Sequence, residues 1–124
     1  MDFNKYVGIP FEKLDCYRFV QWVLEDAAGI LIPAFDTIGT EDSRRIYLNF
    51  LNEISGNWKQ VDQPQKFDVV AMAYDARHPK FVQHFGVYIG NGLMLHTLKY
   101  IGSHSIKLEH PAIHSSIRGI YRWT

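Results

Sequence analysis

The hydrophobic periodicity of the chain changes once, near Phe67, and this change limits the folds open to it. Before Phe67, apolar side chains recur every three or four residues in two segments, which predicts amphipathic helices. After Phe67, short β-rich runs alternate with turn residues, which predicts antiparallel strands. This order is typical of the α+β class, with N-terminal helices packed on one side of an antiparallel sheet. Since 124 residues suit one domain, we assign residues 1–124 to a single domain.

Asp15 and Gly29 bracket the first predicted helix. Asp15 is a good N-cap residue and Gly29 a good stop, so the first helical residue is Cys16. A second helix is predicted from about Glu41 to Ser55, after a loop over residues 30–40. The apolar stripe of the first helix consists of Cys16, Phe19, Val20, Val23, Leu24 and Ala27.

The predicted strands all lie in the second half of the chain, apart from a short one before it. They cover residues 58–61, a buried run within 67–74, a hairpin over 84–98, and residues 105–108 and 119–123, with a turn or short helix near 111–116.

The loop length of the predicted hairpin decides where its two histidines lie. A two-residue loop places His84 and His96 on opposite faces of the sheet. A three-residue loop over residues 90–92 pairs Ile89 with Leu93 and places both histidines on one face. We favour the three-residue loop because it brings two polar imidazoles together and strands neither in apolar packing.

Cys16 is the only cysteine in the sequence, so it is either a buried apolar residue or a reactive thiol. At a helix N-terminus the dipole and the free N–H groups favour the thiolate, so a reactive Cys16 is expected to have a lowered pKa. His84 would then take the thiol proton, and His96 would orient the His84 ring. The free amide of Cys16 suits an oxyanion hole.

Other histidine arrangements remain open from residue type alone. Cys16, His84 and His96 are also zinc-ligand types, although only three ligands are evident. His110 and His114 have the spacing of a helical metal pair, but a proline crowds that segment and no acidic or cysteine partner stands nearby. A surface turn is the expected role of that pair, and no metal or other cofactor is expected in the chain.

The charge balance excludes some partners. Thirteen basic residues cancel thirteen acidic ones, so no basic field exists to attract the phosphates of a nucleic acid. The longest apolar runs are too short to span a membrane. The N-terminus lacks the charged-then-apolar layout of a signal peptide, so we expect synthesis in the cytoplasm.

Four segments resemble the NlpC-type papain-like cysteine peptidases in the same order along nearly the whole chain. The segment YVGIPFEKLDCYRFVQWVLEDAAGILIP resembles their active-site block, in which an Asp-Cys pair opens a long helix. QKFDVVAM is similar to their Pro-Gly-Asp-Leu-Val strand. HFGVYIGNGLMLH is similar to their two-histidine hairpin, with the same twelve-residue step, and GIYRW resembles the last strand of phage-tail members.

The resemblance implies a papain-like thiol hydrolase that cleaves peptidoglycan stem peptides, typically between D-γ-glutamate and diaminopimelate. By position, Cys16 corresponds to the nucleophile, His84 to the base and His96 to the orienting third member. Asp15 corresponds to the acidic residue that receives the free α-amine of the substrate. Tyr6 corresponds to the tyrosine near the oxyanion site, although it stands two residues closer to the cysteine.

The sequence departs from the family after the cysteine. The family usually has Ser-Gly-Leu there, and this chain has Tyr17-Arg18-Phe19. Tyr17 is therefore expected to narrow the cleft, and Arg18 to change its charge and contact the substrate. The long insertion over about residues 33–64 is expected to wall the substrate groove.

The same resemblance leaves two other roles open. One is a phage tail-tip assembly component of the same fold, with a tail protein as partner and secondary or no hydrolysis. The other is a toxin or effector delivered by a secretion-machine protein, with another acyl substrate. In each role the protein would act on the wall after release or delivery, or within a virion.

Overall fold

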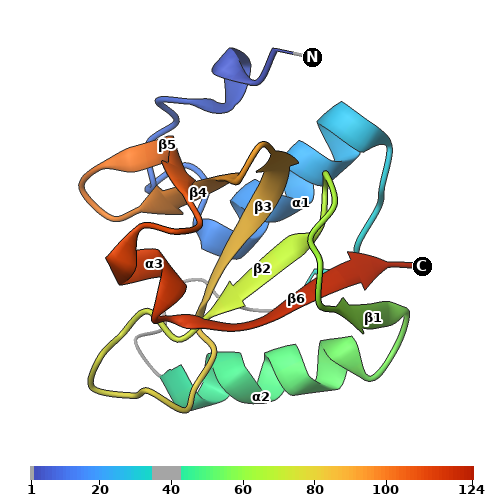
Figure 1. Cartoon of the computed structure of the whole chain (residues 1–124), viewed down its shortest axis with the longest axis vertical. Helices are drawn as coiled ribbons and strands as arrows, with labels where there is room; N and C mark the ends of the chain where they lie inside the picture. The colour runs from blue at the N-terminus through green and yellow to red at the C-terminus, as the bar shows by residue number, and fades with distance from the viewer. Residues whose placement is uncertain (1, 35–42) are drawn as a thin grey trace.

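The computed structural model describes residues 2–34 and 43–124, drawn in colour in Figure 1. The predicted order of helices before an antiparallel sheet is confirmed, and one short helix lies between the last two strands. In chain order the elements are η1 (Asn4–Tyr6), α1 (Cys16–Ala28), α2 (Ser43–Ile54), β1 (Trp58–Val61), β2 (Val69–Met72), β3 (His84–Gly90), β4 (Leu93–Leu98), β5 (Gly102–Lys107), α3 (Pro111–His114) and β6 (Ile117–Trp123).

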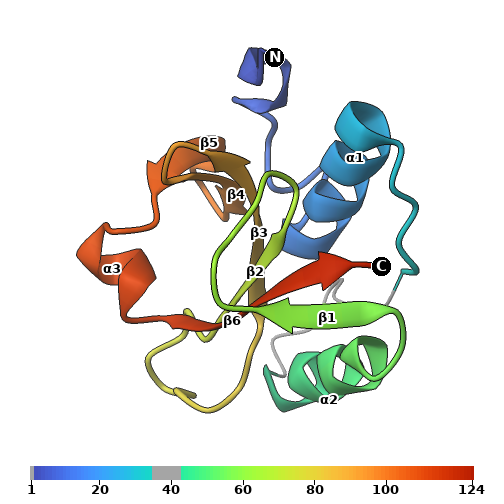
Figure 2. The same ribbon diagram turned by 45° about the vertical axis from the view of Figure 1, so that its right-hand side comes forward.

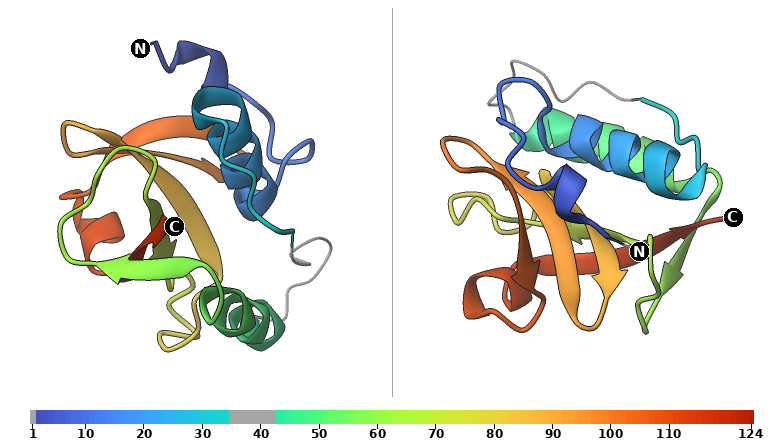
Figure 3. Two further views of the ribbon diagram at one scale, coloured as in Figure 1. Left: turned by 90° about the vertical axis from the view of Figure 1, so that its right-hand side faces the viewer. Right: turned by 90° about the horizontal axis from the view of Figure 1, so that it is seen from above.

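The strands form one sheet in the order β1-β6-β2-β3-β4-β5, and each neighbouring pair is antiparallel. The C-terminal strand β6 therefore lies inside the sheet, between β1 and β2, as Figure 2 shows. Helices α1 and α2 lie together on one side of the sheet, and α3 lies on the other (Figure 3). Both faces of the sheet are thus covered, which explains why its central strands are almost wholly buried.

Two apolar clusters fill the two sides. The larger one joins α1 and α2 to the sheet through residues such as Phe19, Phe50 and Phe85. The smaller one lies under α3 and is built from Val70, Met72, Met94 and Ile113. None of the helices in the described ranges has the length and apolar character needed to cross a membrane.

Helix α1 has the predicted bounds. The Asp15 carboxylate accepts the Arg18 backbone N–H at 3.0 Å, which satisfies one of the free donors of the first turn. Gly29 ends the helix in the left-handed conformation, with φ of 67°. The predicted second helix corresponds to α2, although its first predicted residues, 41 and 42, lie outside the described residues. Residues 35–40 of the predicted loop, which also belong to the insertion expected to wall the substrate groove, lie outside them too.

The β3–β4 hairpin has the predicted histidine register but a different turn. Gly90, not Ile89, pairs with Leu93, so the loop has two residues, Asn91 and Gly92, both with positive φ. A bulge at Ile89 then shifts the register. Farther from the turn the pairing is the one that the three-residue loop predicts, so the two histidines share a face.

Gly86 is a position of the hairpin where a side chain would not fit. A Cβ atom added there would lie 2.5 Å from Met94 Sδ and 2.9 Å from the Leu95 carbonyl oxygen. Met94 is wholly buried, so its thioether fills the space that a side chain at position 86 would need. The glycine thus lets the smaller apolar cluster pack directly beneath the histidines.

Candidate active site

Cys16 lies where the N-terminus of α1 meets the start of β3. Its Sγ is 3.8 Å from the carbonyl oxygen of Gln83, the residue before His84. The backbone N–H of Phe85, the residue after His84, also approaches the sulfur. The sulfur therefore rests against the backbone on both sides of His84, and Cys16 is only 7% exposed.

Three histidines form a hydrogen-bonded line that leads away from this point. His84 Nε2 lies 2.9 Å from His96 Nδ1. His96 Nε2 lies 3.0 Å from His104 Nε2, and His104 Nδ1 lies 2.9 Å from the carbonyl oxygen of Gly102. The structure thus brings together Cys16, His84 and His96, and it adds a histidine that the sequence analysis missed.

The signal for His104 was present in the sequence as a second hairpin. His96 and His104 pair directly across β4 and β5, and a tight turn at Tyr100, with φ of 72°, makes this pairing possible. The predicted strand began only at Ser105, so His104 fell just outside it. A non-glycine residue with positive φ gives no clear turn signal in a sequence.

Burial favours the neutral forms of the Cys16 thiol and of the His84 and His96 imidazoles. It raises the pKa of Cys16 to about 12, and the neighbouring Asp15 carboxylate adds to the rise; nearby backbone N–H groups offset only part of it. Burial also lowers the pKa of His84 to about 4 and that of His96 to about 2. The expected lowering of the Cys16 pKa is therefore wrong, because desolvation and the Asp15 charge outweigh the backbone N–H groups around the sulfur.

The loop between β2 and β3 packs beside His84. The Gln83 side-chain oxygen accepts the backbone N–H of Tyr74 at 2.5 Å and that of Asp75 at 3.4 Å. This places the Tyr74 ring 5.1 Å from the His84 ring, centroid to centroid. Gln83 thus contacts the thiol through its backbone carbonyl and binds the β2–β3 loop through its side chain.

Tyr6 does not lie at the oxyanion site that the resemblance implied. Its hydroxyl donates to Asp26 Oδ2 at 2.8 Å, and its ring packs against Trp22. Asp26 is ten residues beyond Cys16, which is about 15 Å of helix. Tyr6 therefore lies toward the other end of α1, where burial and the Asp26 carboxylate raise its pKa to about 12.

The two residues that follow Cys16 point in different directions. Arg18 is exposed on the first turn of α1. Tyr17 is buried: its ring packs edge-on against Phe85, and its hydroxyl donates to the Pro33 carbonyl at 2.8 Å. The expectation that Tyr17 narrows the cleft is wrong, because its side chain belongs to the core.

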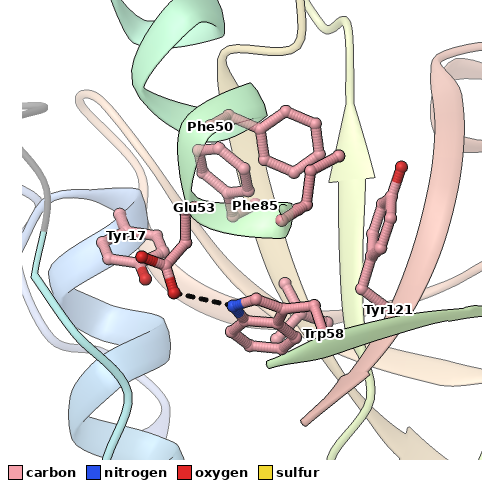
Figure 4. Close-up of a pocket in the computed structure, with 8 residues that line it drawn as sticks. Tyr17, Phe50, Glu53, Trp58, Phe85 and Tyr121 are labelled. Carbon is pink, nitrogen blue, oxygen red and sulfur yellow. Dashed lines mark hydrogen bonds between the residues drawn. The ribbon is translucent and has the colours of Figure 1, made fainter. Parts of the chain in front are cut away.

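An apolar pocket lies between Tyr17, α2 and the β1–β6 edge, as Figure 4 shows. The hydrogen bond drawn in Figure 4 runs from the Trp58 indole N–H to the Glu53 carboxylate, at 2.7 Å. Cys16, His84 and His96 are not among the residues that line it. The pocket is therefore separate from the histidine line.

The alternative metal sites gain no support from the geometry. Within residues 2–34 and 43–124, no group of three or more His, Cys, Asp or Glu side chains converges to hold a metal ion. His110 caps the short helix α3 by accepting the Ala112 backbone N–H, and both His110 and His114 are exposed. This is the surface turn that was predicted for the pair.

The chain matches one protein family and several solved structures. The model of the NlpC/P60 family matches residues 4–121 of the chain. An NlpC/P60 family protein from Bacillus cereus is 27% identical, with a TM-score of 0.60, over 88% of this chain and 31% of that one. An NLP/P60 family protein from Staphylococcus aureus, described as similar to a lipoprotein, is 21% identical, with a TM-score of 0.56, over 88% and 32% of the two chains.

The NlpC/p60 domain of the peptidoglycan hydrolase SagA has the same fold, with 16% identity and a TM-score of 0.61 over 96% of this chain and 91% of that one. The chain spans about a third of the length of the Bacillus and Staphylococcus proteins. No curated protein sequence matches it.

Proposed function

Because the chain belongs to the NlpC/P60 family, we propose that it is a thiol hydrolase that cleaves peptidoglycan stem peptides through Cys16, His84 and His96. The observation that carries the proposal is the Cys16 sulfur resting against the backbone on both sides of His84, which is itself bonded to His96. The domain of the peptidoglycan hydrolase SagA, which has the same fold, supports the choice of substrate.

The reaction starts from a neutral thiol and a neutral imidazole. His84 Nε2 faces His96, so Nδ1 is the nitrogen that takes the thiol proton as Cys16 Sγ attacks the amide carbonyl. The C–N bond breaks, the His84 imidazolium gives its proton to the leaving amine, and a thioester remains. Water then loses a proton to His84 and attacks the thioester, the C–S bond breaks, and the peptide leaves as a carboxylic acid while His84 returns the proton to the Cys16 sulfur. The backbone N–H groups of the first turn of α1 would stabilise the oxyanion.

Asp15 and Arg18 are the charged residues of the first turn that we assign to substrate binding. The Asp15 carboxylate would pair with the free α-amine of the stem peptide, and this role is compatible with its N-cap bond because a carboxylate has several acceptor positions. The exposed Arg18 guanidinium would pair with a carboxylate of the peptide. These contacts fit cleavage between D-γ-glutamate and diaminopimelate, in cell wall that the protein reaches after release or delivery.

Digestion of purified muropeptides tests the proposal. The full chain should release new amino termini from diaminopimelate-containing stem peptides, as followed by chromatography and mass spectrometry. Cys16→Ala and His84→Ala should abolish this release, whereas His114→Ala, a change at an exposed histidine, should leave it intact. A folded parent chain that leaves muropeptides uncut would overturn the proposal, and so would equal cleavage by Cys16→Ala.

A further inference from the structure

We propose that His104 is a positioning residue that fixes the tautomers of His96 and His84, so that the lone pair of His84 Nδ1 is free to act as the base. This inference rests on the proposed function, because it concerns the base of that same reaction. It assigns a role to the residue of the histidine line that lies farthest from the thiol.

The direction of the line is set at its far end by a backbone carbonyl. A carbonyl oxygen can only accept, so His104 Nδ1, 2.9 Å from the Gly102 oxygen, must carry the hydrogen. A neutral imidazole has one N–H, which leaves His104 Nε2 as an acceptor. No choice of tautomer remains for neutral His104 while this bond is made.

The direction of the His104 bond fixes the donor and the acceptor in the next two hydrogen bonds. His96 Nε2, 3.0 Å from the acceptor on His104, must donate, so His96 Nδ1 is an acceptor. His84 Nε2, 2.9 Å from that acceptor, must donate in turn, and His84 Nδ1 is left with its lone pair. These directions hold while the rings are neutral, and burial favours the neutral form of the two rings nearer the thiol: His96 is wholly buried and His84 is 6% exposed.

Without the acceptor on His104, the reversed arrangement is favoured. The competent arrangement would then bury an unpaired N–H on His96, which is costly. In the reversed arrangement His96 Nδ1 donates to His84, and the hydrogen of His84 moves to Nδ1, where it can no longer accept the thiol proton. The aligned N–H groups of the competent arrangement also favour the imidazolium that forms on His84 during the reaction.

The backbone around Gly102 is built to keep this carbonyl in place. Gly102 has φ of 84°, and an added Cβ atom would lie 2.9 Å from the Ile9 carbonyl oxygen. Ser103, the next residue, donates its backbone N–H to that same oxygen, and its hydroxyl donates to the Tyr6 carbonyl at 2.6 Å. The N-terminal segment thus clamps the strand that carries His104.

Three substitutions separate a relay from a merely structural role. His104→Gln places an acceptor near the Nε2 position. His104→Asn keeps a donor for the Gly102 carbonyl but does not reach His96, and His104→Leu removes both. We expect kcat for muropeptide cleavage to fall about five-fold to a hundred-fold in the Asn and Leu variants, with KM unchanged, and the Gln variant to recover most of it.

Nitrogen NMR reads the tautomers without any substrate. At a pH of about 8, we expect the parent and His104→Gln to show His84 protonated at Nε2, and His104→Leu to show it protonated at Nδ1. If His84 keeps the Nε2 tautomer in the Leu and Asn variants, or if Asn restores kcat as well as Gln does, the inference is wrong. Failure of the proposed function is a distinct result, since the parent chain would then cut no muropeptide whatever its tautomers.

Discussion

Buried neutral histidines should set the acid limit of stability for this domain. The pKa of His84 falls from 6.5 to about 4 on folding because burial disfavours the charged ring. At a pH between these two pKa values, His84 is protonated in the unfolded chain and neutral in the folded chain. The free energy of unfolding therefore decreases as the pH falls from 6.5 to about 4. At about 1.4 kcal/mol per pKa unit, His84 alone removes about 3 kcal/mol.

His96 acts in the same direction, since burial lowers its pKa to about 2. Its contribution extends the loss of stability to more acidic pH, and the two rings are coupled through their hydrogen bond, so we take about 3 kcal/mol as the scale of the loss. Domains of this size are stable by about 5–15 kcal/mol. A loss of 3 kcal/mol or more is therefore large enough to measure and small enough to leave a folded population near pH 4.

Urea unfolding followed by tryptophan fluorescence provides the assay, at a series of pH values from about 7.5 to 4. His84→Gln replaces the titrating ring with an amide, so its free energy of unfolding should fall with pH by about 3 kcal/mol less than that of the parent. His114→Gln, at an exposed position, should keep the pH dependence of the parent. Parallel losses in the parent and in His84→Gln would show that burial does not hold this imidazole neutral.

Two further substitutions test the packing and the electrostatics around the site. Gly86→Ala would place a methyl group 2.5 Å from Met94 Sδ, and we expect a loss of about 1–3 kcal/mol in calorimetry; an unchanged midpoint would contradict the close approach. Asp15→Asn keeps an N-cap but removes the carboxylate that helps raise the pKa of Cys16, so iodoacetamide should react about two- to five-fold faster near pH 8 with helix content unchanged, and an equal rate would refute this contribution.

The parts of the fold that local chemistry specifies were predictable from the sequence. Helix α1 begins at Cys16 because Asp15 caps it, and it ends before Gly29 because that residue adopts a left-handed conformation. Both signals act within one turn of the helix ends, so no tertiary contact is needed to locate them. The position of the thiol at a helix N-terminus follows directly from them.

In the β3–β4 hairpin the predicted histidine register is confirmed, but the predicted loop length is wrong. The placement of His84 and His96 on one face needed only the correct register away from the turn, which the polar character of both rings favoured. The turn itself was misjudged, since the bulge at Ile89 restores a register that the two-residue loop alone would shift. A bulge leaves no clear mark in a sequence when the residues at its position are ordinary strand residues.

The remaining differences depend on contacts between distant segments. Tyr6 lies at the far end of α1 because its hydroxyl finds Asp26, twenty residues along the chain. His104 lies beside His96 because β5 returns across a turn in which Tyr100, a non-glycine residue, has positive φ. The raised pKa of Cys16 reflects the layers packed around it. Spacing and residue type carry none of this information, because each effect is set by burial and by the arrangement of other elements.

A thiol that is protonated at rest changes how this site would have to work. Burial raises the pKa of Cys16 and lowers that of His84, so the neutral thiol and imidazole are favoured over an ion pair at rest. We therefore expect proton transfer and attack to occur together, when a bound carbonyl accepts the developing charge in the oxyanion hole. Such a thiol would react slowly with alkylating reagents yet rapidly with a well-placed peptide, so substrate cleavage is a better measure of this site than thiol reactivity.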